Sequence, residues 1–190
     1  AEVAVVATDV TRAEDVRRAV AHALSTYGAL HGVVHAAGVL RDGLIAGKSA
    51  EDVRAVLAPK VAGARHLYDA TRHLGMDFLV LCSSTAAAWG NRGQADYACA
   101  NAFLDGFAEG KPGVVSVGWP GWADGGMPLD DTALRTMGLK AMDTPTAMDI
   151  LLRAAGSGRP HLVALVGSAD TITSRFAPVT AEPVAATEPV

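Results

Sequence analysis

The sequence predicts an α/β fold, a doubly wound and mostly parallel sheet with helices on both of its faces. Half of the 190 residues are apolar and only 5% are aromatic, a composition that suits buried parallel strands covered by helices. Apolar runs alternate with helical patterns along nearly the whole chain, as they do in βαβ units. One domain with a substantial core is expected at this length.

Five apolar runs are the predicted strands of this sheet. In chain order they span residues 3–10, 30–38, 77–82, 113–119 and 161–167. Candidate functional residues stand at the carboxyl ends of the first four runs, where ligands of open parallel sheets bind. These residues are Asp9, His35 to Gly38, Ser83 and Ser84, and Trp119 to Trp122.

The first two helical patterns carry start and stop signals. Thr11 and Glu14 are expected to form a capping box for the first helix. Ser49 is expected to start a second helix, which Pro59 interrupts. The helical pattern then resumes and ends near Gly75.

Two later helices and a tail complete the pattern. One helix is expected over residues 96–108, and another begins at Thr144 with Pro145 in its first turn. Residues 178–190 are rich in Pro, Ala and Glu without apolar periodicity, so they are interpreted as a linker. The expected division is a folded domain over residues 1–177 followed by this linker.

Composition excludes several classes of function. The net charge is −4 and the basic residues are scattered, so no nucleic-acid partner is expected. No apolar run approaches the ~20 residues of a membrane span and no signal sequence opens the chain, which predicts a cytoplasmic protein without a membrane partner. Cys82 and Cys99 are expected to be reduced thiols. His31 and His35 lie in a predicted strand, where their spacing predicts no metal site.

The stretch from Ser83 to Asn101 carries the candidate chemistry. Residues four apart share one face of a helix, so Tyr97 and Asn101 would face one space. The Tyr97 phenol, with an ordinary pKa of about 10, could give a proton to the oxygen of a ketone that gains a hydride. Ser84 could donate a second hydrogen bond to that oxygen. The Lys60 ammonium would lower the pKa of the phenol, and Asn101 could hold a water or orient Lys60.

Each residue alone has a simpler structural interpretation. A helical tyrosine usually packs, a helical lysine is usually solvated, and a serine at a strand end is often a cap. Asp9 could merely cap the helix that follows, and Trp89 could anchor its loop. It is the combination that favours catalysis.

The combination resembles the short-chain dehydrogenase/reductase superfamily, and more closely the ketoreductase domains of modular type I polyketide synthases. The resemblance covers residues 1–170. It rests on TDVT (8–11), VVHAAGVLRDG (33–43), LAPKVAGARHL (57–67), FLVLCSSTAAAWGNRGQADYACANAFLDGFA (78–108) and SVGWPGWADGGM (116–127). The ordinary superfamily pattern has lysine four residues after the tyrosine. Polyketide ketoreductases have asparagine there and lysine on the preceding helix, as this chain does with Asn101 and Lys60.

The resemblance implies a Rossmann-like fold and NADPH-dependent reduction of a β-ketoacyl group to the β-hydroxyacyl form. The substrate would be carried on the phosphopantetheine arm of an acyl carrier protein, and other domains of the same megasynthase would be further partners. Ser84 and Tyr97 would grip the carbonyl, supported by Lys60 and Asn101. The residues implied at the cofactor are Lys60 and Tyr97, Asp9 and Val10 near the adenine, Ala36, Ala37 and Gly38 along the adenosine, and Pro120 and Gly121 near the nicotinamide.

Two features depart from the family pattern. The first strands and the glycine-rich turn G-x-G-x-x-G are absent from the sequence, so the pyrophosphate site is not encoded here. We therefore expect either a piece of a longer polypeptide or a remaining segment on a separate chain, and we expect this chain alone neither to hold NADPH well nor to fold stably. In FAEGKPGVVSV, residues 107–117, the helix and the loop after it look shorter than is usual in the family.

The family's two fingerprints of hydroxyl configuration conflict in this chain. An LDD motif goes with one configuration, and here LRD keeps Asp42 but has Arg41 in the central position. A tryptophan eight residues before the tyrosine goes with the other, and Trp89 occupies that place. Because the central aspartate is replaced, the L-hydroxy outcome is expected.

Two alternative functions stay open. A free-standing short-chain alcohol dehydrogenase acting on a small ketone is disfavoured by Asn101 and by the Pro-rich tail. A non-catalytic, ketoreductase-like structural segment of a megasynthase is compatible with the missing glycine-rich turn.

Overall fold

A computed structural model of the chain describes residues 2–125 and 138–176. The described elements, in chain order, are α1 (Ala13–Tyr27), β1 (Gly32–His35), η1 (Ile45–Gly47), α2 (Ala50–Thr71), β2 (Phe78–Ser84), α3 (Thr85–Trp89), α4 (Ala95–Ala108), β3 (Val114–Trp119), α6 (Thr144–Ala155), β4 (His161–Val163) and α7 (Ala169–Phe176). The predicted linker over residues 178–190 lies outside the described residues.

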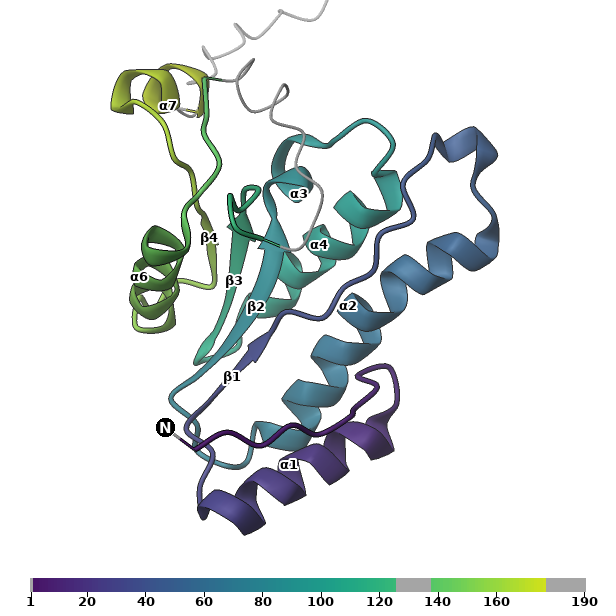
Figure 1. The fold of residues 1–190 in the computed structure, drawn as a ribbon, viewed down its shortest axis with the longest axis vertical. Coiled ribbons are helices and arrows are strands. Elements are labelled where there is room, and N and C mark those ends of the chain that lie inside the picture. Colours follow the sequence, from purple (N-terminus) through teal and green to yellow (C-terminus); the bar gives the residue numbers. More distant parts are fainter. Residues whose placement is uncertain (1, 126–137, 177–190) are drawn as a thin grey trace, which may run out of the picture.

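The four strands form one parallel sheet in the order β1-β2-β3-β4, which confirms the predicted α/β class. β2 and β3 are the long central strands, and their register pairs Ser84 with Trp119. Because all four strands run in the same direction, their carboxyl ends meet at one edge of the sheet (Figure 1). The predicted site residues of β2 and β3 therefore lie at the same edge.

Helices cover both faces of the sheet, and each face has its own core (Figure 1). Side chains alternate between the faces of a strand, so Val80 packs in the cluster that contains α6 residues, whereas Leu79 and Leu81 pack in the cluster with Leu104 of α4. α1 packs against α2 rather than against the sheet.

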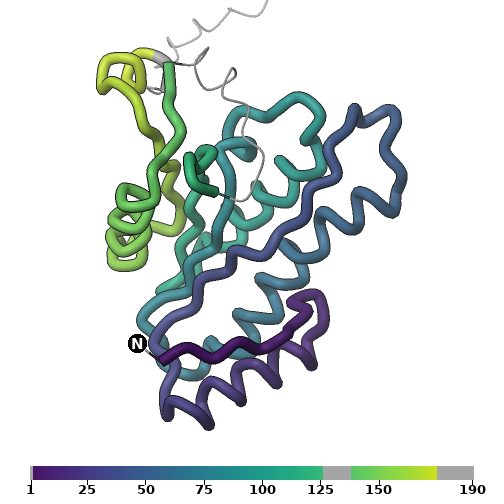
Figure 2. The backbone as a smooth tube through the Cα atoms, in the orientation of Figure 1, coloured from purple at the N-terminus to yellow at the C-terminus, as the bar shows by residue number. Residues whose placement is uncertain are grey.

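The prediction of a strand over residues 3–10 is wrong. This segment is extended but pairs with no described strand, and Figure 2 shows it as a tube that leads into α1. Val3 and Val5 are 80% and 95% exposed. A strand requires a neighbour for its backbone N–H and C=O groups, and none of the described strands offers one here.

The predicted capping box of α1 is also wrong, whereas the predicted cap of α2 is confirmed. The N-cap of α1 is Arg12, with no side-chain hydrogen bond. Thr11 instead donates its hydroxyl and its backbone N–H to the Asp9 carboxylate, at 2.7 and 2.9 Å. The Ser49 hydroxyl accepts the backbone N–H of Asp52 at 3.0 Å, as an N-cap should.

Pro59 does not interrupt the second helix, contrary to the prediction. α2 runs unbroken through it from Ala50 to Thr71. Pro59 is buried, and its carbonyl accepts a hydrogen bond from the His35 ring at 3.0 Å. Burial lowers the pKa of His35 to about 4, so at neutral pH the ring is neutral and donates through Nε2. Packing of this kind overrides the low helix propensity of proline.

The remaining predicted elements agree with the structure in type. α4 and α6 match the predicted helices closely, while β4 is shorter than the apolar run that predicted it. The short helix α3 was not predicted. Within the two described ranges, no helix combines the length and the apolar character needed to cross a bilayer.

Candidate active site

Three candidate side chains meet at the carboxyl end of β2. Ser84 is the last residue of that strand, and Tyr97 and Asn101 lie one turn apart on α4. Side-chain hydrogen bonding by Ser84 and Asn101 lowers the pKa of the Tyr97 phenol. The Ser84 oxygen also caps α3, accepting the Ala86 N–H at 3.1 Å. Ser84 therefore serves as a strand-end cap and contacts the phenol as well.

Asn101 is fully buried and only half satisfied. Its side-chain Nδ2 donates to the backbone carbonyl of Tyr97 at 2.8 Å, and its backbone carbonyl accepts the Ser83 hydroxyl at 3.2 Å. Among the described residues, the side-chain oxygen Oδ1 has no hydrogen-bond partner. A buried acceptor without a partner costs about 1–3 kcal/mol, so a donor from outside the described residues, such as water, is expected at this atom.

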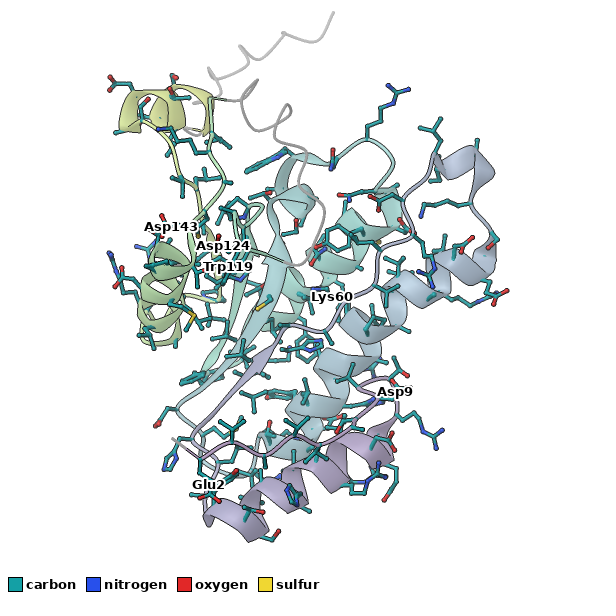
Figure 3. The ribbon with its side chains drawn as sticks, viewed as in Figure 1. Glu2, Asp9, Lys60, Trp119, Asp124 and Asp143 are labelled. Carbon is teal, nitrogen blue, oxygen red and sulfur yellow. The ribbon has the colours of Figure 1, made fainter. Side chains whose placement is uncertain are left out.

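The Lys60 side chain extends from α2 to the backbone of β2, two residues before Ser84. Its Nζ donates to the Cys82 carbonyl at 2.6 Å, and Figure 3 shows the side chain beside the sheet. The residue is only 4% exposed. Burial lowers the pKa of Lys60 to about 8, against the opposing effects of Cys82 and Asp105. The ammonium therefore releases its proton far more readily than an ordinary lysine does.

The pKa of Tyr97 is raised, not lowered as the sequence analysis expected. Burial is the largest cause, and the Asp42 carboxylate and Cys82 raise it further, while the hydrogen bonds with Ser84 and Asn101 lower it. The phenol therefore keeps its proton at neutral pH. This state suits a proton donor.

The two residues predicted to govern hydroxyl configuration lie in the loop after β1 and at the end of α3. Asp42 lies in the loop after β1, where its carboxylate accepts a hydrogen bond from the Gln94 amide at 2.9 Å. Its negative charge raises the pKa of the Tyr97 phenol. Trp89 is the last residue of α3 and is partly buried. It therefore belongs to a helix and not to the loop that was expected.

The residues predicted near the adenine lie at the start of α1. Figure 3 shows Asp9 there, away from Lys60. Hydrogen bonds with Thr11 lower the pKa of the Asp9 carboxyl and orient it. The Val10 carbonyl accepts a hydrogen bond from His66 of α2 at 3.1 Å. Asp9 therefore orders the turn before the helix and does not cap α1, whose N-cap is Arg12.

The other residues predicted at the cofactor follow two strands. Ala36, Ala37 and Gly38 come directly after β1, and Ala36 is exposed. Pro120 and Gly121 come directly after β3, where the Gly121 carbonyl accepts the Met142 N–H at 3.0 Å. Both groups lie at the carboxyl ends of their strands, the position predicted for ligand contacts.

Sequence reasoning missed a buried ion pair beside these residues. The Lys48 ammonium lies 2.5 Å from the Asp96 carboxylate, and each side chain is 4% exposed. Asp96 directly precedes Tyr97, and an acid in the first turn of a helix is a common feature. Nothing in the sequence pattern indicated that Lys48, forty-eight positions earlier, would reach it.

The arrangement can bind and polarise a carbonyl oxygen. The hydroxyl groups of Ser84, at a strand end, and of Tyr97 interact closely enough for Ser84 to lower the pKa of the phenol. Two such donors can hold one oxygen, and a buried cation nearby stabilises the negative charge that develops on it. Lys60 is the candidate cation.

This fold and site define an α/β protein of the short-chain dehydrogenase/reductase type. The chain is similar in fold to a Serratia marcescens short-chain dehydrogenase/reductase mutant, with a TM-score of 0.73 and 23% identity over 84% of this chain and 74% of that one. Residues 1–124 match the family model described as the KR domain, and the chain belongs to this family, the ketoreductase domains of polyketide synthases.

Named relatives agree with that assignment. The chain is 41% identical over 162 residues to polyketide synthase PksL of Bacillus subtilis, covering 78% of this chain and 4% of PksL. It is 43% identical over 184 residues to polyketide synthase GfsA of Streptomyces halstedii, covering 93% of this chain and 2% of GfsA. A crystal structure of a ketoreductase domain from the bacillaene assembly line matches with a TM-score of 0.80 and 32% identity, covering 88% of this chain and 43% of that one. The chain thus spans a small part of these synthases and less than half of that domain.

Proposed function

We propose that this chain provides the carbonyl-binding and proton-donating half of an NADPH-dependent ketoreductase. The observation that supports this most is the half-buried Tyr97 phenol, whose pKa responds to the side chains of Ser84 and Asn101, with the buried Lys60 ammonium at the Cys82 carbonyl of the adjoining strand. The substrate is a β-ketoacyl group on the phosphopantetheine arm of an acyl carrier protein, and the product is the β-hydroxyacyl group. Other domains of the same synthase are the further partners.

The proposed chemistry assigns each residue one task. The Ser84 hydroxyl donates a hydrogen bond to the substrate carbonyl oxygen and holds it beside Tyr97. When NADPH is bound, it supplies the hydride that reaches the carbonyl carbon. The Tyr97 phenol gives its proton to the oxygen as that oxygen becomes an alkoxide. The Lys60 ammonium then stabilises the phenolate left behind, and Asn101 holds a water through its unpartnered Oδ1.

The residues present fit a nicotinamide nucleotide in part. A buried ammonium at Lys60 and an unpartnered acceptor at Asn101 can bind groups rich in hydroxyls, such as a ribose. Small residues after β1, Ala36 to Gly38, leave room for close approach of a ligand. A glycine-rich turn for the pyrophosphate is absent from the sequence.

Replacing Tyr97 with phenylalanine tests the proton donor. The variant keeps the ring and loses the hydroxyl, so we expect kcat for NADPH-dependent reduction of a β-ketoacyl thioester to fall at least about 100-fold. Tyr27→Phe, at a half-exposed tyrosine that ends α1, is the matched control and should keep kcat. The measurement is the decrease in NADPH absorbance over time, made with the full-length protein. Parental kcat in Tyr97→Phe would rule out the proposed donor.

The same assay tests the configuration of the product. We propose the L-hydroxy product, because Trp89 occupies its family position while Arg41 replaces the central aspartate of the competing motif. Chiral chromatography of the reduced thioester, after release of the acid, distinguishes the two outcomes. A product of mainly D configuration would refute this assignment.

A second candidate function is a ketoreductase-like structural segment of a synthase that does not catalyse reduction. The two functions differ in a simple measurement. A ketoreductase oxidises NADPH in the presence of a β-ketoacyl thioester, whereas a structural segment leaves NADPH unchanged with the same substrate.

A further inference from the structure

The buried ion pair of Lys48 and Asp96 joins two segments that are far apart in the sequence. Lys48 follows η1, at the end of the loop that leaves β1, and Asp96 lies in the first turn of α4. Both side chains are 4% exposed, and their charged atoms lie 2.5 Å apart. Neither residue belongs to the catalytic group proposed above.

Each member of the pair makes a second hydrogen bond, either to a site residue or to the residue beside one. The second carboxylate oxygen of Asp96, Oδ1, accepts the backbone N–H of Tyr97 at 3.0 Å. The Lys48 ammonium also donates to the carbonyl of Arg41, the residue before Asp42. One ion pair therefore connects the backbone at Tyr97 with the backbone at Asp42.

Two further hydrogen bonds join the same two segments. The Gly43 N–H donates to the Gly93 carbonyl at 2.9 Å, and the Gln94 amide donates to the Asp42 carboxylate at 2.9 Å. Gly93 has φ +81°, a left-handed conformation that glycine adopts without strain. The loop after β1 and the start of α4 are thus held together along several residues, with the ion pair as the charged contact.

A purely electrostatic cap does not explain this pair. An aspartate in the first turn stabilises a helix while it remains exposed, so a cap gives no reason to bury a lysine on top of it. Removing two charges from water is costly, and buried pairs are best known for fixing one arrangement among several. The arrangement fixed here is the separation between the Asp42 loop and the helix end that carries Tyr97.

We propose that Lys48 and Asp96 are positioning residues. They fix the position of the Tyr97 phenol relative to the Asp42 loop at the place where the substrate carbonyl binds. The inference rests on the proposed function, because it takes Tyr97 as the proton donor. Misplacement of a reacting group by about 1 Å can cost 100-fold in rate. The pair should therefore act on kcat and leave KM nearly unchanged.

The test uses four variants and one control variant, each made in the full-length protein. Lys48→Met and Asp96→Asn each remove one charge, and their combination removes both. Lys48→Arg restores the cation. Lys111→Met is the matched control, because the Lys111 ammonium donates to the Phe107 carbonyl at 2.6 Å at the opposite end of α4. All are measured for kcat, KM, product configuration and melting temperature.

We expect kcat to fall about 10- to 100-fold in Lys48→Met and in Asp96→Asn, with KM within about threefold of the parent. The kcat of the double variant should be no lower than that of the less active single variant, because the two substitutions remove the same interaction. Lys48→Arg should recover most of kcat. Lys111→Met should lower the melting temperature and keep kcat. If Lys48→Met kept kcat within about twofold well below its melting temperature, the pair would only stabilise the fold and the inference would be wrong.

Hydrogen exchange separates failure of this inference from failure of the proposed function. The Tyr97 amide and the amides of residues 41–48 should exchange faster in Lys48→Met than in Lys111→Met, whether or not the parent reduces a ketone. If the parent had no reductase activity, faster exchange would still support the positioning role. Unchanged exchange at those amides would overturn it.

Discussion

Burial and charge oppose each other at Lys60. The side chain is 4% exposed, and burial lowers its pKa to about 8 from 10.5. A buried ammonium lowers stability, but it provides the positive charge that the proposed proton transfer from Tyr97 requires. Conflict of this kind between stability and charge is typical of functional sites.

The conflict predicts a pH-dependent difference in stability. Between pH 8 and 10.5 the unfolded chain binds more protons at Lys60 than the folded chain, so this residue makes stability rise with pH in that interval. Relative to Lys60→Met, the parent's free energy of unfolding should therefore increase by about 3 kcal/mol between pH 7 and pH 10.5. Urea unfolding at both pH values measures it, with Lys140→Met, at an exposed lysine, as the reference. A constant difference would contradict the buried-ammonium interpretation.

Helix ends show how local signals and tertiary structure combine at the scale of elements. Ser49 and Thr11 both precede an acidic first turn, and the sequence predicts a cap at both. Only the Ser49 hydroxyl accepts a helix N–H. Thr11 donates to Asp9 instead, because the chain before α1 turns there and places that carboxylate within 2.7 Å.

This difference predicts unequal effects of the same substitution. Ser49→Ala should lower the free energy of unfolding by about 1 kcal/mol, since it leaves the Asp52 N–H without its cap. Thr11→Ala removes no helix cap and should cost less. Thermal unfolding of both variants against the parent measures the two effects. Equal losses would mean that Thr11 caps α1 in solution.

At the scale of the whole molecule, the sheet is covered on both faces, and each of its edge strands, β1 and β4, has a single neighbour among the described strands. Among the described strands, β1 pairs with β2 alone, and Val34 of β1 is 44% exposed. The extended segment before α1 exposes Val3 and Val5. Exposed apolar residues beside an unpaired edge mark a region where further backbone can pair.

This edge, together with the missing glycine-rich turn, predicts weak cofactor binding by the 190-residue chain alone. The Lys60 and Asn101 groups can contact a ribose, but no glycine-rich turn of this chain holds the pyrophosphate. NADPH fluorescence titration of the isolated chain should give a dissociation constant well above the micromolar range. Micromolar affinity would show that the pyrophosphate binds elsewhere in this chain.

The sequence by itself determined the fold class and the set of residues from which the candidate site is built. Apolar runs and helical periods are local properties, so β2, β3, α4 and α6 could be predicted from them. The four-residue spacing likewise predicted that Tyr97 and Asn101 share one face of a helix, and both residues lie on α4.

Only the tertiary structure decided how distant residues interact. Whether residues 3–10 form a strand depends on a neighbouring strand. The continuity of α2 through Pro59 depends on the burial of Pro59 and on its contact with the His35 ring. The raised pKa of Tyr97 and the pairing of Lys48 with Asp96 depend on desolvation and on contacts between segments far apart in the chain. Solvent exclusion and contacts between distant segments arise only when elements pack, so a local sequence pattern cannot predict them.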